Sequence, residues 1–191
     1  MRHLAIIPGA SLPPRSVAFV EPMECLAVSK LPEGSQWVFE IKLDGYRALG
    51  IKSNGSVRLL SRRNNSFNQQ YPLVVKALAE LPEDTIVDGE IVALDASGFP
   101  NFNLLQNYRT EAARIHFFIF DLLVHQGRDL TRLPLIERRE IMRSVLKFSA
   151  GRVRTTDYLE ASTTDMLHAV RQQGLEGIIG KRKDSINSAS S

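Results

Sequence analysis

The sequence predicts an α+β fold in which mostly antiparallel sheets pack against helices. Segments with strand-like alternation lie between segments with helical spacing, and turn signals connect several strands directly to the next. The composition, with 43% hydrophobic and 24% charged residues, is typical of a globular protein. A chain of 191 residues can form one domain with a sizeable core.

Prolines are concentrated near the N-terminus, with five between residues 8 and 34. Proline disfavours helix and sheet interiors, so we expect an extended arm lying over the core. We divide the chain into this N-terminal arm, residues 1–20, and one domain, residues 21–191.

The next elements are a strand, a hairpin and a helix. Residues 37–42 alternate as a strand, and Asn54-Gly55 is a strong turn signal because both residues tolerate positive φ angles. A helix is expected over about residues 68–81, where apolar residues recur at helical spacing. These residues are Leu73, Val74, Ala77, Leu78 and Leu81.

The second half predicts three strands and two helices. Strands are expected at 85–95 and 115–124, the latter buried on both faces, with a turn at Gln126-Gly127. Pro134 should open a helix, and Ser162 should cap another that ends near Gln172. A short strand flanked by glycines is expected within the stretch GLEGIIGKRK.

Charge and cysteine content limit the partners and the compartment. The net charge is only +3, but arginines outnumber lysines, and guanidinium groups suit phosphate and carboxylate ligands. The single cysteine, Cys25, indicates a reducing compartment, so we expect a cytoplasmic protein. No apolar run approaches the roughly 20 residues of a membrane span, and we expect no membrane contact. The four histidines lack metal-ligand spacing.

Lys42 ends the strand 37–42 in the sequence KLDGYR. Alternation places Val38, Glu40 and Lys42 on one face, which we assign to chemistry, and the other three residues on a core face. Burial would lower the pKa of Lys42 and make its amine nucleophilic. The carboxylate of Asp44 opposes this effect, and the metal of a bound polyphosphate would offset it.

Two further residues of KLDGYR suit a ligand site. Gly45 would let the backbone turn tightly against a ligand, and Arg47 would direct a guanidinium toward it. The alternative is that Lys42 is a solvated strand end paired with Glu40 or Asp44.

The stretch Lys42–Arg47 resembles the nucleotidyl-acceptor motif of the covalent nucleotidyltransferases, which include ATP-dependent DNA ligases, RNA ligases and mRNA capping enzymes. Four stretches similar to the other family motifs follow in family order: Leu60–Asn64, Val87–Glu90, Phe118–Leu123 and Glu176–Lys181. The flanking sequences LPEGSQWVFEIKLDGYRAL and PLIERREIM are most similar to bacterial ligases of the end-joining repair type. The resemblance covers the chain from about residue 20 and implies the nucleotidyltransferase (ATP-grasp-like) fold.

The resemblance implies that Lys42 attacks the α-phosphorus of ATP and carries AMP, which then passes to the 5′-phosphate of nicked double-stranded DNA. It implies that Glu40 accepts a hydrogen bond from the adenine amino group, unless Glu40 instead pairs with Lys42. Ile41 belongs to the implied ATP-binding residues. Arg47 and Glu90 would hold the ribose hydroxyls.

Other implied roles are open to competition from neighbouring residues. Arg62, or Arg63 in its place, would meet the nucleotide or the nick phosphate. Phe120 would stack on adenine, although Phe117 and Phe118 compete for that role. Asp121 would support the site, and its burial requires a partner such as Lys42 or backbone donors.

The resemblance also implies a divalent cation. Glu90 and Glu176 would bind Mg²⁺ or Mn²⁺ near the α-phosphate, since oxygen ligands suit these hard ions. Ion pairing within the fold is the alternative for Glu90. Lys181 would lie near the phosphates, or its basic stretch would contact DNA backbone or solvent.

Related ligases continue beyond this point to a further lysine motif and an OB-fold domain. The ten residues after Lys181 leave no room for either, so we expect no OB-fold domain in this chain and only partial ligase activity. A separate OB-fold or repair protein is then a candidate partner. The alternatives are an impaired ATP- or DNA-end-binding module and an RNA ligase-like nucleotidyltransferase.

Overall fold

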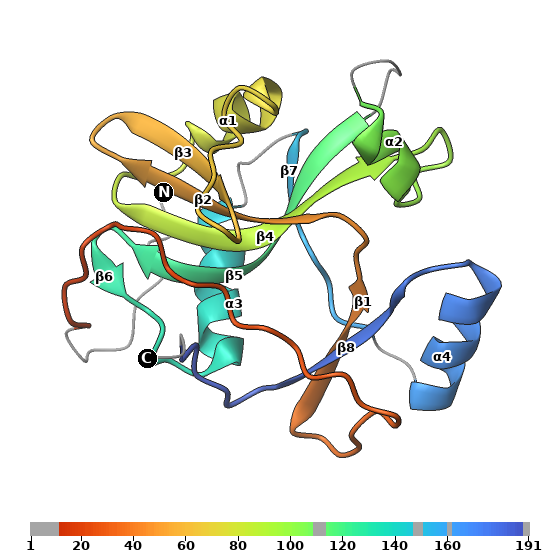
Figure 1. Cartoon of the computed structure of the whole chain (residues 1–191). Helices are drawn as coiled ribbons and strands as arrows, with labels where there is room; N and C mark the ends of the chain where they lie inside the picture. The colour runs from red at the N-terminus through yellow and green to blue at the C-terminus, as the bar shows by residue number, and fades with distance from the viewer. Residues whose placement is uncertain (1–11, 109–113, 147–150, 160–161, 189–191) are drawn as a thin grey trace.

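The computed structural model describes residues 12–108, 114–146, 151–159 and 162–188 and has an α+β architecture with two sheets (Figure 1). The larger sheet has six strands in the order β3-β2-β4-β5-β6, and β7 also pairs with β5. All neighbours in this sheet are antiparallel except β5 and β7. The strands are β2 (Tyr46–Ser53), β3 (Ser56–Ser61), β4 (Thr85–Leu94), β5 (Arg114–His125), β6 (Arg128–Asp129) and β7 (Val153–Thr155).

The predicted turns are confirmed. Asn54 and Gly55 connect β2 to β3 with φ angles of 51° and 72°, and Gln126 and Gly127 connect β5 to β6 with 49° and 72°. Positive φ at both central residues matches the right-handed twist of the flanking strands. These turns connect the adjacent strands of each pair directly.

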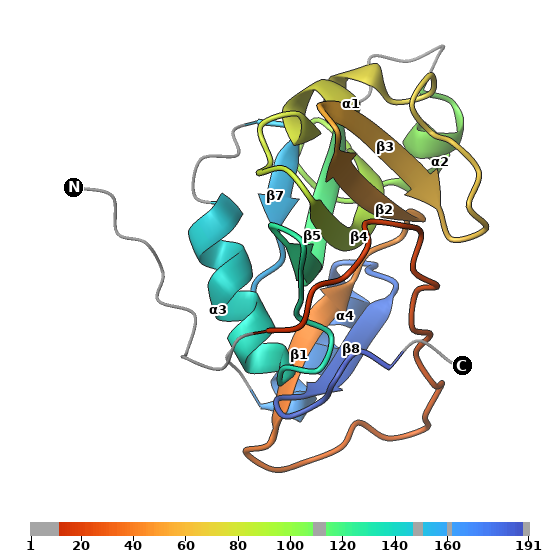
Figure 2. The ribbon, with the colours of Figure 1, turned by 90° about the vertical axis from the view of Figure 1, so that its left-hand side faces the viewer.

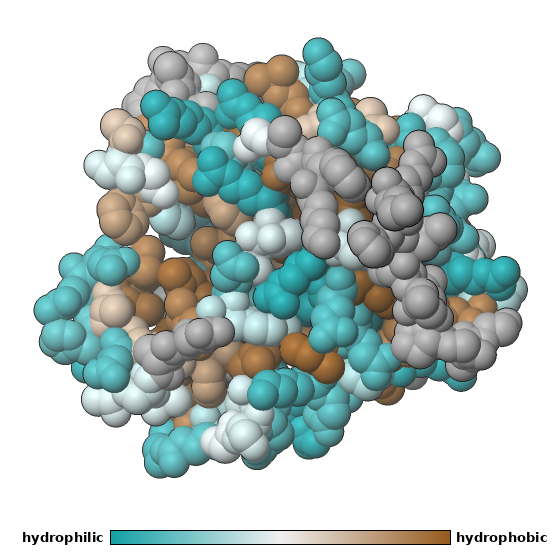
Figure 3. All heavy atoms as spheres, turned by 180° about the vertical axis from the view of Figure 1, so that it is seen from behind, coloured by the Kyte–Doolittle hydropathy of each residue, from teal (hydrophilic) through white to brown (hydrophobic). Residues whose placement is uncertain are grey.

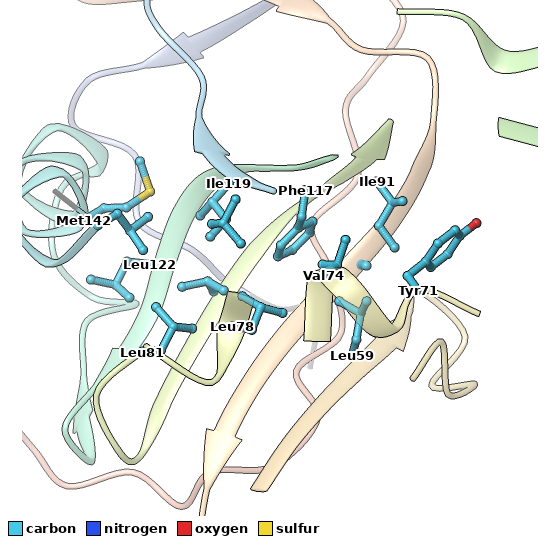
Figure 4. Packing of buried hydrophobic residues seen from close by; sticks show 14 of the residues in the cluster. Leu59, Tyr71, Val74, Leu78, Leu81, Ile91, Phe117, Ile119, Leu122 and Met142 are labelled. Carbon is cyan, nitrogen blue, oxygen red and sulfur yellow. The ribbon is translucent and has the colours of Figure 1, made fainter. Parts of the chain in front are cut away.

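One face of the larger sheet packs against three helices, α1 (Pro72–Leu78), α2 (Phe102–Gln106) and α3 (Leu135–Val145). Side chains from β3, α1, β4, β5 and α3 converge in this core (Figure 4).

The predicted helix 68–81 is shorter than expected and begins at Pro72. Leu73, which we expected on its apolar side, is 57% exposed.

The opposite face of the larger sheet is covered by the N-terminal segment. Val17, Phe19 and Val20 pack against a second apolar cluster formed by β2, β3, β4 and β5. The backbone N–H of Arg15 donates to the carbonyl of Gly127, which ties this segment to the β5–β6 turn. The part of the arm that the structure describes, from residue 12, therefore lies over the core as expected.

The second sheet has two antiparallel strands, β1 (Trp37–Lys42) and β8 (Gly177–Arg182). Figure 2 shows this pair beneath the larger sheet, and α4 (Thr163–Gln172) precedes β8. The hydroxyl of Ser162 accepts a hydrogen bond from the Asp165 N–H, so the predicted cap is confirmed.

Burial along β1 does not follow the alternation of its two faces. Val38, Phe39 and Glu40 are all buried in succession, whereas Lys42 is exposed. Both faces of the middle of β1 are covered because α3 reaches Glu40 from the side opposite Phe39. Burial of Glu40 therefore does not follow from alternation along the strand alone.

Seen from behind, the molecular surface is mostly hydrophilic, with hydrophobic spheres visible in a hollow at one side (Figure 3). Among the helices of the described residues, none has the length and apolar character to cross a membrane.

Candidate active site

Lys42 lies at the end of β1, directly opposite Gly177 at the start of β8. This register brings Glu176, the residue before β8, to the lysine, and Nζ of Lys42 donates a hydrogen bond to Oε1 of Glu176. The two residues are 134 positions apart in the sequence, and only the β1–β8 pairing makes them neighbours.

The ionisation of Lys42 differs from our expectation. Its side chain is 48% exposed, and the hydrogen bond to Glu176 raises the pKa of Lys42 above its ordinary value, although partial burial acts in the opposite direction. The charge of Asp44 raises this pKa further. The prediction of a desolvated amine with a lowered pKa is wrong for this state, and the partner is Glu176 rather than Glu40 or Asp44.

A further carboxylate, that of Glu90 on β4, lies close enough to Glu176 and Asp44 to interact with both. Burial, together with the negative charges of Asp88, Glu176 and Asp44, raises the pKa of Glu90 to about 8, against the opposing effect of Arg47. Within the described parts of the chain, the Glu90 carboxylate makes no hydrogen bond or ion pair, so the alternative of an internal ion pair finds no support there. Glu90, Asp44 and Glu176 thus interact with one another, and two of them, Asp44 and Glu176, also act on Lys42.

Arg47 on β2 is fixed by Asp88 on β4. Its Nε lies 2.6 Å from Oδ1 of Asp88 and its Nη2 lies 2.7 Å from Oδ2, in a two-pronged pair. Burial disfavours the charge on Arg47, but the bonds to Asp88 outweigh burial and raise its pKa. The guanidinium Cζ also lies 4.5 Å from the centre of the Phe120 ring. Arg47 thus presents a fixed positive charge next to an aromatic face.

Phe120 lies at an irregularity of the β4–β5 ladder. Asp88 pairs with Asp121, but the next residue, Gly89, pairs with Ile119, so Phe120 is left without a partner on β4. Such bulges redirect a side chain and release backbone groups from the ladder. Of the competing phenylalanines, Phe117 is fully buried in the core, whereas Phe120 faces Arg47 and Lys181.

Glu40 is 2% exposed and is held by three side chains. Its Oε1 accepts a hydrogen bond from Nη1 of Arg139 at 2.7 Å. Its Oε2 accepts from the hydroxyl of Thr156 at 3.0 Å and from Nζ of Lys181 at 3.1 Å. The alternative of a Glu40–Lys42 pair is therefore wrong. Lys181, also 4.5 Å from the Phe120 ring centre, lies beside the two residues expected to face adenine.

Asp121 does not pair with Lys42, which corrects one of our two expected partners. Its carboxylate accepts two hydrogen bonds of 2.8 Å from Arg138 on α3, and Oδ1 also accepts from the backbone N–H of Leu122. Oδ2 accepts a weaker bond of 3.3 Å from the amide of Asn187. The predicted backbone donor is present, but an arginine that sequence reasoning did not assign supplies the charge.

Comparison with known proteins identifies the family of this chain. The sequence model of the family described as "ATP dependent DNA ligase domain" matches residues 22–190, nearly the whole chain. The chain belongs to the ATP-dependent DNA ligase family. The ligase domain is 37% identical over 169 residues to the "Multifunctional non-homologous end joining protein LigD" of Pseudomonas aeruginosa, covering 85% of this chain and 20% of that protein.

Another relative is the "Multifunctional non-homologous end joining DNA repair protein LigD" of Mycobacterium tuberculosis. It is 38% identical over 155 residues, which covers 80% of this chain and 20% of the relative. The ligase domain thus spans about a fifth of the length of these curated relatives.

Solved structures agree with the fold. The structure described as "mycobacterial DNA ligase D complexed with ATP and MES" superposes with a TM-score of 0.74 at 33% identity, over 90% of this chain and 56% of that chain. The ligase domain of M. tuberculosis LigD gives a TM-score of 0.68 at 34% identity, over 82% of this chain and 50% of that chain. The predicted α+β nucleotidyltransferase fold is confirmed.

Gly45 of the ligase domain has a different structural reason from the one we expected. A Cβ atom at this position would lie 2.2 Å from the carbonyl oxygen of Ile91 and 2.9 Å from Cγ of Glu90. The close approach of the β1–β2 connection to β4 therefore requires glycine. A turn against a ligand is not needed to explain it.

The remaining predicted site residues are Ile41, Arg62 and its alternative Arg63. Ile41 is half-buried and pairs with Ile178 across β1 and β8. Arg62 and Arg63 are exposed in the turn after β3. Among the described residues, the side chain of Arg62 makes no hydrogen bond or ion pair. The structure thus places Glu176 and Asp44 near Lys42, and Phe120 beside Arg47 and Lys181, but leaves Arg62 facing solvent.

The carboxylates fit a hard divalent cation. No three His, Cys, Asp or Glu side chains of the described chain converge into a complete metal cage. Mg²⁺ is usually held by only one or two carboxylates together with water and substrate phosphates. Glu176 and the partly buried Glu90, which has no ionic partner among the described residues, provide such carboxylates.

Sequence reasoning missed three residues that hold the site: Asp88, which fixes Arg47, and Arg139 and Thr156, which hold Glu40. Asp88 belongs to a recognised motif, yet no role was assigned to it. The two adjacent arginines of α3, Arg138 and Arg139, are 2% and 0% exposed. The available signal was the pair Arg138-Arg139 in a helix with an apolar side. If these guanidinium groups are buried, they require carboxylate partners.

Proposed function

We propose that the ligase domain forms a covalent lysyl-AMP. Nζ of Lys42 attacks the α-phosphorus of ATP, a phosphorus–nitrogen bond forms, and the bond to pyrophosphate breaks. A covalent intermediate divides one difficult transfer into easier steps. The observation that carries this proposal is the position of Lys42 at the β1–β8 junction, against Glu176 and close to Asp44.

Attack requires the lone pair of the Lys42 amine. In the structure this amine is ion-paired and has a raised pKa, so it must leave Glu176 and lose a proton before it can react. A bound Mg²⁺ or Mn²⁺, held by Glu90 and Glu176, would neutralise charge on the phosphate oxygens. Asp44 is close enough to influence the pKa of Lys42 and supports its orientation.

The other side chains would bind the nucleotide. Glu40 accepts a hydrogen bond from the adenine amino group, Phe120 stacks on the base, and Arg47 with Glu90 holds the ribose hydroxyls. The further nucleotide contacts that we propose come from Ile41, Arg62 and Lys181. Phosphoryl transfer depends mainly on such positioning and on charge neutralisation.

We further propose that the bound AMP serves to seal nicked double-stranded DNA in end-joining repair. The names of the relatives, which are multifunctional end-joining proteins, support this substrate and pathway. The closing of DNA around the site would involve further protein, either an OB-fold or a repair partner. The exposed free Cys25 suits the reducing cytoplasm.

The chemistry is tested with ATP labelled at the α-phosphate with ³²P, incubated with the chain and Mg²⁺ and then denatured. Label should remain on the wild type and on Lys76→Ala, a control at an exposed lysine of α1, but not on Lys42→Ala. No label on the wild type, or equal label on Lys42→Ala, would contradict the proposal.

A binding module without chemistry is the second candidate, favoured by the ion pair that keeps Lys42 charged. This candidate predicts ATP binding in a titration but no covalent label. An RNA ligase-like activity predicts the same label but better sealing of nicked RNA than of nicked DNA, since the 2′-hydroxyl distinguishes the two substrates.

A further inference from the structure

Arg139 of α3 is fully buried and connects three separate parts of the chain. Its Nη1 donates to Oε1 of Glu40 on β1, to the carbonyl of Phe120 on β5 at 3.1 Å and to the hydroxyl of Thr156 at 2.9 Å. Its Nη2 donates to the carbonyl of Thr156 at 2.5 Å. The guanidinium also lies over the ring of Tyr158, with 4.5 Å between Cζ and the ring centre.

The contact with Phe120 depends on the bulge in β5. Because Phe120 has no partner on β4, its carbonyl is available to a donor outside the ladder. Arg139 occupies this carbonyl and thereby fixes the backbone from which the Phe120 ring projects. The same guanidinium group therefore holds the residue expected to cover the base and the residue expected to recognise its edge.

Glu40 is restrained in orientation. A carboxylate offers about four acceptor positions. Arg139, Thr156 and Lys181 occupy three of them in the structure, with donors on both oxygens. These three bonds fix the plane of the carboxylate. About one acceptor position remains for a ligand.

Burial of this arginine is not explained by stability alone. A buried ion pair offsets its desolvation only when the geometry and the remaining hydrogen bonds are good. The Nε of Arg139 has no hydrogen-bond partner among the described residues. The arrangement leaves one donor unsatisfied while directing Nη1 and Nη2 at groups of the candidate base site, which indicates a role in geometry.

We propose that Arg139 is a positioning residue for base selection, which holds the Glu40 carboxylate aimed as an acceptor so that the site prefers ATP to GTP. This inference rests on the proposed function of Glu40 at the adenine edge. Adenine presents an amino donor at position 6, whereas guanine presents a carbonyl acceptor there, which a fixed carboxylate disfavours. Loss of Arg139 lets the Glu40 carboxylate turn away from this position, and the preference weakens.

Arg138 provides a matched control on the same helix. It is also buried and pairs with a carboxylate, but it binds Asp121 and the carbonyls of Leu133 and Ser185 rather than Glu40. Arg138→Lys and Arg139→Lys therefore make the same chemical change at neighbouring buried positions. Only Arg139→Lys removes the guanidinium group that holds the Glu40 carboxylate and the Phe120 carbonyl.

The test measures the dissociation constants of ATP and GTP by calorimetry in the presence of Mg²⁺, with circular dichroism to check folding. The wild type should prefer ATP, and Arg139→Lys should reduce that preference by roughly 10- to 100-fold. Arg138→Lys should change it by less than about 3-fold. In self-adenylation by ATP, the Arg139 substitution should act mainly on KM rather than on the maximal rate.

If Arg139→Lys does not fold, Thr156→Val decides the question, because it removes hydrogen bonds to Glu40 and Arg139 without leaving a buried charge unpaired. It should reduce the preference for ATP several-fold. An unchanged preference in a folded variant, or a wild type that binds both nucleotides equally, overturns the inference.

Failure of the inference can be told apart from failure of the proposed function. Selective ATP binding without covalent label contradicts the proposed chemistry and leaves the inference standing. Equal labelling by ATP and GTP contradicts the inference and leaves the chemistry standing. Binding of neither nucleotide contradicts both.

Discussion

Replacing Glu90 with glutamine should alter how the stability of the fold depends on pH. Burial, with the charges of Asp88, Glu176 and Asp44, raises the pKa of Glu90 from 4.5 to about 8 in the folded chain. Between these values the folded state retains a proton that the unfolded state has released. The contribution of Glu90 to the free energy of unfolding therefore falls as the pH rises from 4.5 to about 8. Above about pH 8 this contribution is lost completely.

The size of this effect follows from the pKa difference of Glu90. A shift from 4.5 to about 8 corresponds to at most roughly 5 kcal/mol, because each unit of pKa difference is about 1.4 kcal/mol. The Glu90 side chain is not completely buried, so solvent screens its interactions. We therefore expect roughly half of this maximal free energy. Glutamine has the same shape and stays uncharged, so the Glu90→Gln variant should not show this loss.

Urea unfolding of the wild type and Glu90→Gln, near pH 5 and again near pH 8.5, measures the difference. The variant should gain roughly 2 to 3 kcal/mol relative to the wild type between the two conditions. Other titrating groups affect both proteins equally and cancel in the comparison. Parallel pH profiles would refute the assignment of a buried, mostly neutral carboxyl to Glu90.

Three further predictions concern the surroundings of the site. Gly45→Ala should destabilise the fold by roughly 1–3 kcal/mol in urea unfolding, because the added methyl meets the β4 backbone, and an unchanged midpoint would contradict this. Arg138→Leu should cost roughly 3–5 kcal/mol by leaving a buried carboxylate unpaired, whereas a loss below about 1 kcal/mol would show that the pair is unimportant. Glu176→Gln should lower the pKa of Lys42, so that mildly alkaline acetylation, followed by peptide mass spectrometry, modifies Lys42 faster than in the wild type; equal rates would exclude the ion pair in solution.

Local signals predicted the elements whose structure is decided locally. The Asn54-Gly55 turn and the Ser162 cap are examples, because the positive φ angles of the turn and the hydrogen bond of the cap depend on residues close together in the sequence. The start of α1 could not be predicted in this way. Asn68 lies within the predicted helix, but its side chain instead bonds the backbone of Val57 and Leu59 on β3. A tertiary contact thus holds Asn68 outside the helix to which the spacing of apolar residues assigns it.

The site shows the same limit. KLDGYR and its companion motifs identified the residues around Lys42, but their partners come from distant elements. Glu176 reaches Lys42 only through the β1–β8 register, and Glu40 is buried only because Arg139 approaches from α3. Sequence spacing along one strand contains no information on either contact. The raised pKa of Lys42 and the buried position of Glu40 therefore required the structure.

The central claim is that Lys42 carries a nucleotide covalently, and intact mass spectrometry of the chain after exposure to ATP and Mg²⁺ tests it most directly. The account predicts a gain of one AMP, located on Lys42 by peptide mapping and absent from Lys42→Ala. An unchanged mass, or an AMP attached to another residue, would contradict it.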